Sequence, residues 1–477
     1  MFTRIRSFAG AALRIKPQDH VPPNVARNFP HNVLFNTLDL MAFFFADTFV
    51  SINTIMPVFA ATLTDNPIII GLIPAIANAG WFLPQLFMAG YVSSLKKKLP
   101  FTLRMGVLER LPYLLLPIFA LFVPQLAKSQ AVTLLILIMI LRGLGGGLTA
   151  LPWQELIATV IPITHRSRFF GFSRVLGQFM GVIGSAIAAL VLSRLAYPLN
   201  YAVGFSITVV AQWISFYMFS KNREPEPEPT PLETSPAQIE TVVSLQAECA
   251  VNDTAILGLA EQGTQPNSAP RKMIDFSLFG CILKSDVNLR RYLLARSLLF
   301  IGGMGAAFLA VYGLKKFSLD DGTAAIFTGL IFMSGIVGNA IFGVLGDRIG
   351  PKKVVMIAQV IWLAAMALVL LAPSAGIYYL VFVMFGINSA GMVLGDSILV
   401  MELGDVKHRA TYLGLTRTLT GVFVLLAPFL AGWLVKGFSY PVMFGVSVVF
   451  TVVGTLLFAR VKDQPRHREV VEDALAN

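Results

Sequence analysis

The chain has 477 residues, of which 56% are hydrophobic and 13% are charged, and its formal net charge is +11. In a typical soluble chain about a quarter of all residues are charged, so this composition excludes an ordinary soluble domain. Apolar runs of about 18 residues or more are too long for the strands of a core and predict an all-α protein that spans a membrane.

Residues 1–32 are predicted to form a cytoplasmic arm. Its basic residues surround a short apolar patch at Phe8–Leu13, which is short for a signal peptide and is followed by no clear cleavage site. Residues 33–220 are predicted to form a first bundle of six membrane-spanning helices. The expected spans are 33–60, 67–91, 100–123, 130–158, 170–193 and 199–219.

A proline-rich and then polar segment divides the chain. It opens with Glu224-Pro-Glu-Pro-Glu-Pro and contains too little apolar surface to fold, so residues 221–288 are predicted to be a disordered cytoplasmic linker. Residues 289–461 are predicted to form a second six-helix bundle, and residues 462–477 a cytoplasmic tail. The expected spans of this bundle are 291–313, 323–345, 353–372, 376–402, 410–435 and 440–460.

Lys and Arg are concentrated in alternate loops of this scheme. The positive-inside rule places the basic loops, the linker and both termini in the cytoplasm, and so predicts a multi-pass protein of the cell membrane. The same distribution explains the positive net charge without a nucleic-acid partner. Two cysteines, Cys249 and Cys281, supply neither a disulfide framework nor the spacing of a metal site, and no cofactor is predicted.

An internal repeat indicates that the two bundles are related. The segment His165–Arg174 reads HRSRFFGFSR, and His408–Arg417, 243 residues later, reads HRATYLGLTR. Each segment follows one long predicted span and opens the next. The chain therefore reads as two parallel six-helix repeats that are joined by a linker.

The segment Gly343–Lys353 reads GVLGDRIGPKK and joins two apolar runs. It resembles the signature loop of the major facilitator superfamily, G-x-x-x-D-R-x-G-R-[KR], with Pro351 in place of the first basic residue. This resemblance implies a fold of twelve transmembrane helices in two pseudo-symmetric bundles. The signature positions in this chain are Gly343, Asp347, Arg348, Gly350 and Lys352.

The resemblance also implies a latch. Asp347 would dock at the N-terminus of the fifth span, near Phe170–Arg174, where the helix dipole favours a carboxylate, and Arg348 would hold Asp347 in place. The corresponding segment of the first half, Gly90–Lys98, has lost its acid and its arginine. A latch on one side only is therefore expected.

Polar residues of the first span are candidates for substrate binding and proton coupling. Asn36, Asp47, Ser51 and Thr54 share one helical face, with Asp39 to one side, and a polar stripe of this kind is expected to line a central cavity. Pro57 is expected to interrupt the helix. The run from Asp47 to Pro57, which includes Asn53, is similar to the first helix of drug-efflux members of the superfamily.

Arg142 lies near the middle of the fourth span in the sequence RGLGG, which resembles a fourth-helix motif of proton-coupled members. A mid-membrane arginine needs an acid, and Asp47 or Glu109 are the candidates. Phe385 occupies the equivalent position of the second half. A charge in one half only favours a functional role, and a purely structural ion pair is the alternative.

Several charged residues near the cytoplasmic ends of spans are candidates for gating ion pairs. Glu155 ends the fourth span and Asp396 and Glu402 end the tenth. Each acid is expected to form an ion pair with an arginine of the next span. The alternative is that these acids are solvated at the helix ends and form no ion pair. The gate candidates are Glu155, Arg174, Asp396 and Arg417, and the possible arginine partners are Arg166, Arg174, Arg409 and Arg417.

These residues together predict a secondary transporter that moves a small organic molecule by alternating access, coupled to protons, with export of amphiphilic compounds favoured. Import of a sugar or metabolite, and lipid flipping, are alternatives within the same superfamily. A non-transporting membrane sensor or scaffold is the alternative of another class. The chain contains no nucleophile motif, metal-ligand spacing or phosphate loop that would indicate an enzyme. The expected partners are the substrate, protons and the lipid bilayer, and the protein is expected to be monomeric.

Overall fold

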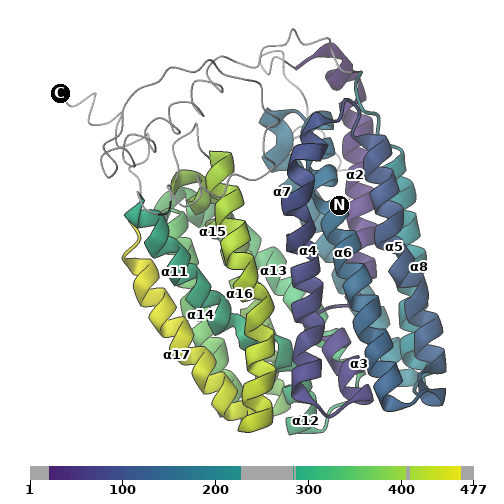
Figure 1. The fold of residues 1–477 in the computed structure, drawn as a ribbon, viewed down its shortest axis with the longest axis vertical. Coiled ribbons are helices and arrows are strands. Elements are labelled where there is room, and N and C mark those ends of the chain that lie inside the picture. The colour runs from purple at the N-terminus through teal and green to yellow at the C-terminus, as the bar shows by residue number, and fades with distance from the viewer. Residues whose placement is uncertain (1–20, 227–282, 284–285, 404–408, 463–477) are drawn as a thin grey trace, which may run out of the picture.

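The computed structural model describes residues 21–226, 283, 286–403 and 409–462, which form a bundle of long helices without a strand (Figure 1). Most of the predicted arm, linker and tail lies outside these residues. The first helix begins at Pro23, inside the segment that was predicted to be the arm.

The first half of the chain contributes eight helical segments to the bundle. Most of their boundaries agree with the predicted spans to within a few residues. In chain order they are α2 (Pro23–Thr48), α3 (Ile55–Leu63), α4 (Pro67–Ser94), α5 (Leu99–Phe122), the short 3₁₀ helix η2 (Val123–Gln125), α6 (Lys128–Val160), α7 (Ile163–Arg194) and α8 (Leu199–Ser220).

The second half repeats this arrangement. Its segments in chain order are α11 (Val287–Gly302), the 3₁₀ helix η3 (Gly303–Phe308), α12 (Leu309–Phe317), α13 (Gly322–Ile349), α14 (Pro351–Leu371), α15 (Ala375–Leu403), α16 (Arg409–Gly437) and α17 (Tyr440–Ala459).

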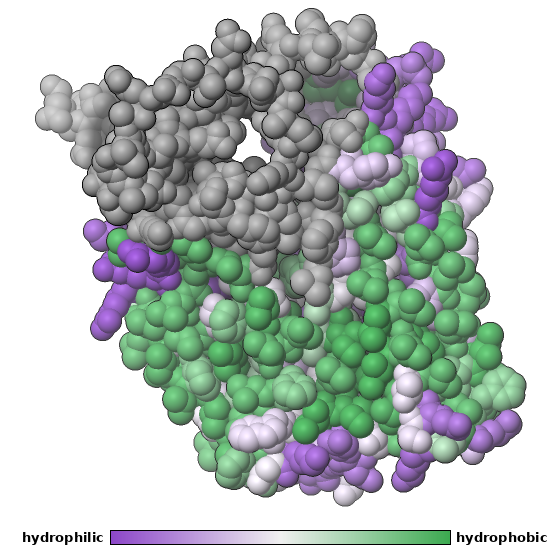
Figure 2. Space-filling model, in the orientation of Figure 1, coloured by the Kyte–Doolittle hydropathy of each residue, from purple (hydrophilic) through white to green (hydrophobic). Residues whose placement is uncertain are grey.

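Ten helical segments of the described residues are long and apolar enough to cross a membrane. The two remaining predicted spans are α2 with α3, which is interrupted, and α4, whose apolar part is Pro67–Phe82. The twelve-span count therefore stays a prediction, while a multi-pass membrane protein is confirmed. Figure 2 shows a broad apolar band with hydrophilic residues at its lower edge and upper right, as a bilayer requires.

The first helix of each half is broken. Residues 49–54 separate α2 from α3, and the 3₁₀ segment η3 separates α11 from α12. The break in the first half precedes Pro57, which lies in the first turn of α3. The expectation that Pro57 itself interrupts the helix was therefore wrong, because a proline in the first turn removes no helical hydrogen bond.

The two halves approach each other closely at one end. Helix α4 packs against α16 and helix α7 against α13. We call the end that carries Gly350 the linker end and the opposite end, which carries α3 and α12, the far end (Figure 1). A Cβ on Gly71 would lie 2.4 Å from the Pro428 carbonyl oxygen, and one on Gly432 would lie 2.6 Å from that of Pro67. These close approaches hold the halves together toward the far end.

The signature segment forms a sharp corner rather than a loop. Helix α13 continues to Ile349, and Gly350, with φ of 94° and ψ of 155°, is the single residue before α14. Only glycine adopts this backbone conformation easily, and Pro351 has a φ suited to the first position of the next helix. The predicted end of this span at residue 345 was therefore too early by four residues.

Candidate functional site

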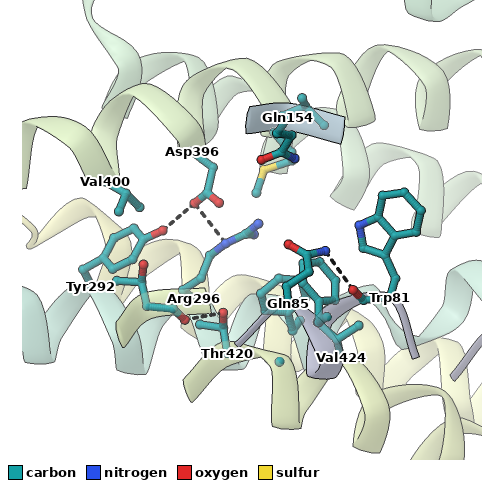
Figure 3. A pocket seen from close by; sticks show the side chains of 15 residues that line it. Trp81, Gln85, Gln154, Tyr292, Arg296, Asp396, Val400, Thr420 and Val424 are labelled. Atoms are coloured by element: carbon teal, nitrogen blue, oxygen red, sulfur yellow. Dashed lines mark hydrogen bonds and ion pairs between the residues drawn. The ribbon is translucent and has the colours of Figure 1, made fainter. Parts of the chain in front are cut away.

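A cavity of about 270 Å³ lies between the two halves, toward the linker end (Figure 3). Both halves contribute to its wall, which combines aromatic rings with amide, hydroxyl and charged groups. The lining residues are Trp81, Phe82 and Gln85 from α4, Gln154 from α6, Tyr292, Arg296 and Phe300 from α11, Met392, Val393, Asp396 and Val400 from α15, and Thr416, Thr420, Gly421 and Val424 from α16.

An ion pair occupies the second-half wall of this cavity. The Arg296 Nε atom lies 3.0 Å from the Asp396 Oδ1 atom, and the Tyr292 hydroxyl donates a hydrogen bond of 2.6 Å to the same oxygen. The Arg296 guanidinium also stacks on Phe300, with Cζ 4.2 Å from the ring centroid. The ion pair and the ring contact thus hold the guanidinium at the edge of the cavity, and the Tyr292 hydroxyl holds its carboxylate partner.

The opposite wall is polar but uncharged. Gln85 donates a hydrogen bond of 2.7 Å to the Trp81 carbonyl oxygen, so its side-chain oxygen remains an acceptor. Figure 3 shows the amide of Gln154 facing the ion pair across the cavity. On the second-half side, Thr420 of α16 donates to the Thr416 carbonyl oxygen and keeps its own acceptor sites. The cavity therefore offers donors and acceptors to a small polar ligand.

A second ion pair lies near mid-depth in the first half. The Arg142 Nη2 atom is 3.1 Å from the Asp47 Oδ1 atom, and Arg142 Nε donates a hydrogen bond of 3.0 Å to the Tyr113 hydroxyl. The Asp47 side chain is 34% exposed, whereas that of Arg142 is 10% exposed. Arg142 Nη1 is buried without a hydrogen-bond partner among the described atoms. Of the two acids expected to face Arg142, Asp47 is the direct partner.

A third group of charges is buried inside the first half. Asp39, Glu109 and Arg110 are each 5–6% exposed and border a separate cavity of about 120 Å³. Arg110 donates to the carbonyl oxygens of Gln212 and Gly106 and to the Ser215 hydroxyl, and its Nη1 atom lies 3.4 Å from Glu109. Ser215 in turn donates to Asp39. The neighbours Glu109 and Arg110 therefore pair with each other.

The predicted polar stripe of the first span does not line one cavity. Asn36 is 1% exposed and exchanges hydrogen bonds with Asn222 of the same half. Asn53 is half-buried in the break after α2. The hydroxyls of Thr54 and Thr328, 2.5 Å apart, join the two halves. The expectation of a continuous stripe was wrong because the helix unwinds after Thr48, which ends its 100° periodicity.

The far end contains one further bond between the halves. The Tyr201 hydroxyl of α8 donates a hydrogen bond of 2.9 Å to Asp321, which precedes α13. Burial raises the pKa of the Asp321 carboxyl, and the bond from Tyr201 offsets part of this rise. Together with the bond between Thr54 and Thr328, this contact closes the far end.

The gate candidates do not pair as expected. Glu155 accepts a salt bridge of 2.9 Å from Lys98 of its own half, because α4 delivers the basic turn before α5 to the end of α6. Asp396 pairs with Arg296, which lies two turns inside α11, and the side chain of Arg409, at the start of the next span, lies outside the described part of the structure. Arg174 is exposed and forms no ion pair with a described residue. The side chain of Arg417 lies outside the described part of the structure.

The signature residues lie at the corner between α13 and α14. Gly343 and Arg348 are exposed on the last turns of α13, and Lys352 is half-buried in the first turn of α14. The side chain of Asp347 lies outside the described part of the structure. The latch between Asp347 and the start of α7 therefore stays a prediction.

Sequence reasoning missed the residues that complete these groups. The sequence pattern does not single out Arg110, Tyr113, Tyr292, Gln85 or Gln154. A helical signal existed for two of them: Tyr113 lies four residues after Glu109, and Tyr292 lies four residues before Arg296, so each pair shares a helix face. The two glutamines carry no such signal.

Comparisons with known proteins agree with this architecture. A family model described as the Major Facilitator Superfamily matches residues 292–475. A hexuronate transporter of Bacillus subtilis (strain 168) is 28% identical over 166 residues, which are 34% of this chain and 39% of that relative. The sequence match thus spans well under half the length of the relative.

Solved structures match over nearly the whole chain. The nucleoside transporter NupG, in a mutant form, has a TM-score of 0.64 at 13% identity and covers 90% of this chain and 99% of its own. A D-xylose-proton symporter has a TM-score of 0.60 at 14% identity and covers 91% of this chain and 98% of its own. At these identities the similarity establishes the fold, in agreement with the predicted two-bundle architecture.

Proposed function

We propose that this chain, which belongs to the major facilitator superfamily, is a secondary transporter that moves a small hydrophilic organic molecule across a membrane by alternating access. The observation that carries the proposal is the polar cavity between the halves, which both halves line and which the far-end contacts close on one side. A solute held there becomes accessible to the other side once those contacts open.

The distribution of basic residues supports a cytoplasmic location of the linker end. The described conformation then corresponds to a state that is closed to the outside. In this proposal the Asp347 latch forms at the linker end when the far end opens, and the protein works as a monomer in the cell membrane.

The character of the cavity supports a hydrophilic substrate. Its volume of about 270 Å³ lies just below the roughly 300–1,000 Å³ of drug-sized ligand pockets, and an ion pair and two glutamine amides form its wall. The relatives are named for transport of a hexuronate, a nucleoside and D-xylose, which are all hydrophilic. We therefore favour transport of a metabolite of this size over export of amphiphilic compounds.

We propose further that protons drive this transport and that Asp47 carries them. The carboxyl of Asp47 lies beside Arg142 at mid-depth and is 34% exposed, so water can reach it. Protonation of Asp47 would remove the charged partner of the buried Arg142 guanidinium, whose Nη1 atom already lacks a hydrogen-bond partner among the described atoms. An isolated buried charge is costly, which couples the protonation state of Asp47 to the packing of α6.

The test is solute uptake into proteoliposomes under an imposed pH gradient. The panel contains sugars, sugar acids, nucleosides and lipophilic cations, and the wild-type protein is compared with Asp47→Asn. We expect uptake of a hydrophilic solute that follows the proton gradient and falls at least about tenfold in the variant. Asp65→Asn is the matched control, because Asp65 is an exposed acid in the loop before α4.

The possible results separate the alternatives. Uptake that ignores the gradient would reject proton coupling and leave a uniporter. Selective uptake of lipophilic cations would restore export of amphiphilic compounds. Absence of flux for every solute would favour the membrane sensor or scaffold.

A further inference from the structure

We infer that Arg296 binds a carboxylate of the substrate, so that the transported compound is a small hydroxylated organic anion, and that Asp396 occupies the guanidinium when the substrate is absent. This inference rests on the proposed function, because it assigns a substrate class to the same cavity. Four features of the cavity carry it.

The first feature is the unused donor capacity of Arg296. Its Nε atom makes the 3.0 Å contact with Asp396, which leaves the N–H donors of the two Nη groups for other partners. The side chain is 12% exposed, and Figure 3 shows the guanidinium reaching toward the centre of the cavity. The two Nη groups of a guanidinium form a planar fork that matches the two oxygens of a carboxylate.

The second feature is the one-sided character of the existing ion pair. Asp396 uses a single oxygen, Oδ1, to accept from both Arg296 Nε and the Tyr292 hydroxyl. A fork-to-fork pair would engage both carboxylate oxygens and two guanidinium nitrogens. The observed pair is weaker than this arrangement, so a substrate carboxylate on the Nη fork can compete with Asp396 for the guanidinium, while the Tyr292 hydroxyl keeps its hydrogen bond to Asp396.

The third feature is the charge inventory of the wall. Among the described lining residues, Arg296 is the one basic side chain and Asp396 the one acidic side chain. Within this described lining an anion therefore has a single attachment point. A cationic group has a poorer one, because it would have to bind the remaining oxygen of Asp396, Oδ2, next to the positive charge of Arg296.

The fourth feature is the opposite wall, which suits hydroxyl groups. The Gln85 side-chain oxygen accepts, the Gln154 amide both donates and accepts, and the Trp81 ring, 38% exposed, offers a flat apolar surface. A hydroxylated carboxylate on the scale of one sugar ring satisfies both walls of a cavity of about 270 Å³.

The experiment measures binding to the full-length protein in lipid nanodiscs by isothermal titration calorimetry, which requires no transport. The probes form matched sets on one carbon skeleton: D-glucuronate, D-glucose and D-glucosamine, and D-gluconate and D-sorbitol. We expect at least one carboxylate to bind about tenfold or more tightly than its neutral counterpart. Arg296→Gln removes this preference, and Arg296→Lys, which keeps the charge but lacks the fork, weakens it.

Asp396→Asn provides a readout that a structural role would not give. Removal of the competing carboxylate raises the affinity for the substrate carboxylate several-fold, whereas simple damage to the cavity lowers it. Lys436→Gln changes an exposed basic residue near the far end of α16 and serves as the charge-matched control. Melting temperatures of all variants show whether they fold.

The inference is overturned if D-glucose or D-sorbitol binds as tightly as its acid, if D-glucosamine is preferred, or if no carboxylate of the panel binds. It is also overturned if Arg296→Gln folds and retains the preference. Transport of a neutral solute with these results would leave the proposed function standing. Carboxylate binding at Arg296 without flux of any solute would instead reject transport and retain the anion site.

Discussion

A pair of adjacent residues that occurs at equivalent positions of both halves shows how the halves of the molecule differ. Gly143 on α6 and Gly386 on α15 are 243 residues apart, and both let the backbone of a partner helix approach closely. The preceding residue is Arg142 in the first half and Phe385 in the second, where it packs on Trp362. Both halves have a glycine at the packing position, but only the first half has a charged residue before it.

The same contrast holds on a larger scale. The first half buries Asp39, Glu109 and Arg110 inside itself, where α5 and α8 saturate the arginine with hydrogen bonds. The second half places Arg296 and Asp396 on the wall of the shared cavity. Helix packing thus follows the repeat, whereas charge placement does not: the first half pairs these charges internally, and the second half presents its ion pair to the shared cavity.

The largest expected effect is the loss of stability in Arg110→Met. This change leaves two buried carboxyls without their cation, and breaking a buried ion pair costs about 3–5 kcal/mol. Arg296→Met is the matched change on the cavity wall, where water reaches the abandoned acid, and we expect a much smaller loss. Melting temperature and the yield of folded protein measure both. Equal losses would erase the distinction between an internal and a ligand-facing charge.

The second effect concerns the packing that both halves share. A Cβ at Gly143 would lie 3.1 Å from the Gly80 Cα atom, and one at Gly386 would lie 2.4 Å from the Ile331 carbonyl oxygen. We expect Gly143→Ala and Gly386→Ala each to cost about 1–3 kcal/mol, with the larger loss at Gly386. Gly376, whose Cβ would meet nothing within 4 Å, is the control and should tolerate alanine. A loss in one half only would contradict equivalent packing.

Sequence reasoning predicted the fold better than the sites. Apolar run lengths and alternating basic loops were sufficient for the helices, because a bilayer imposes one length and one polarity pattern on every span. Pairing between Asp47 and Arg142 was predictable because a mid-membrane arginine has few possible partners. The partner of Asp396 was missed because Arg296 lies about a hundred residues earlier, and only the packed bundle brings α11 against α15.

The smallest effect is a pH dependence of far-end closure. The pKa of Asp321 is raised by burial, so the closed contact holds its proton at a higher pH than the separated state does. Closure is therefore favoured as pH falls and disfavoured as pH rises through the raised pKa, by about 1 kcal/mol or less, as for one hydrogen bond. Distances between spin labels across the far end measure this shift. Asp321→Asn should remove it, and a persistent shift would assign it to another group.

The breaks in the first helix of each half have a mechanical consequence. The outer segments α3 and α12 touch each other at the far end, and each is joined to its half through a few residues outside regular α-helix, 49–54 and 303–308. Each half thus consists of a helix bundle and a short helix, α3 or α12, that is connected to the bundle through a segment outside regular α-helix. In the proposed transport cycle, bending at these residues separates α3 from α12 while α2 and α11 keep their packing, so this part of the opening leaves the charges inside the first half undisturbed. The close approach of Gly71 to Pro428 and the bond between Tyr201 and Asp321 must part as well.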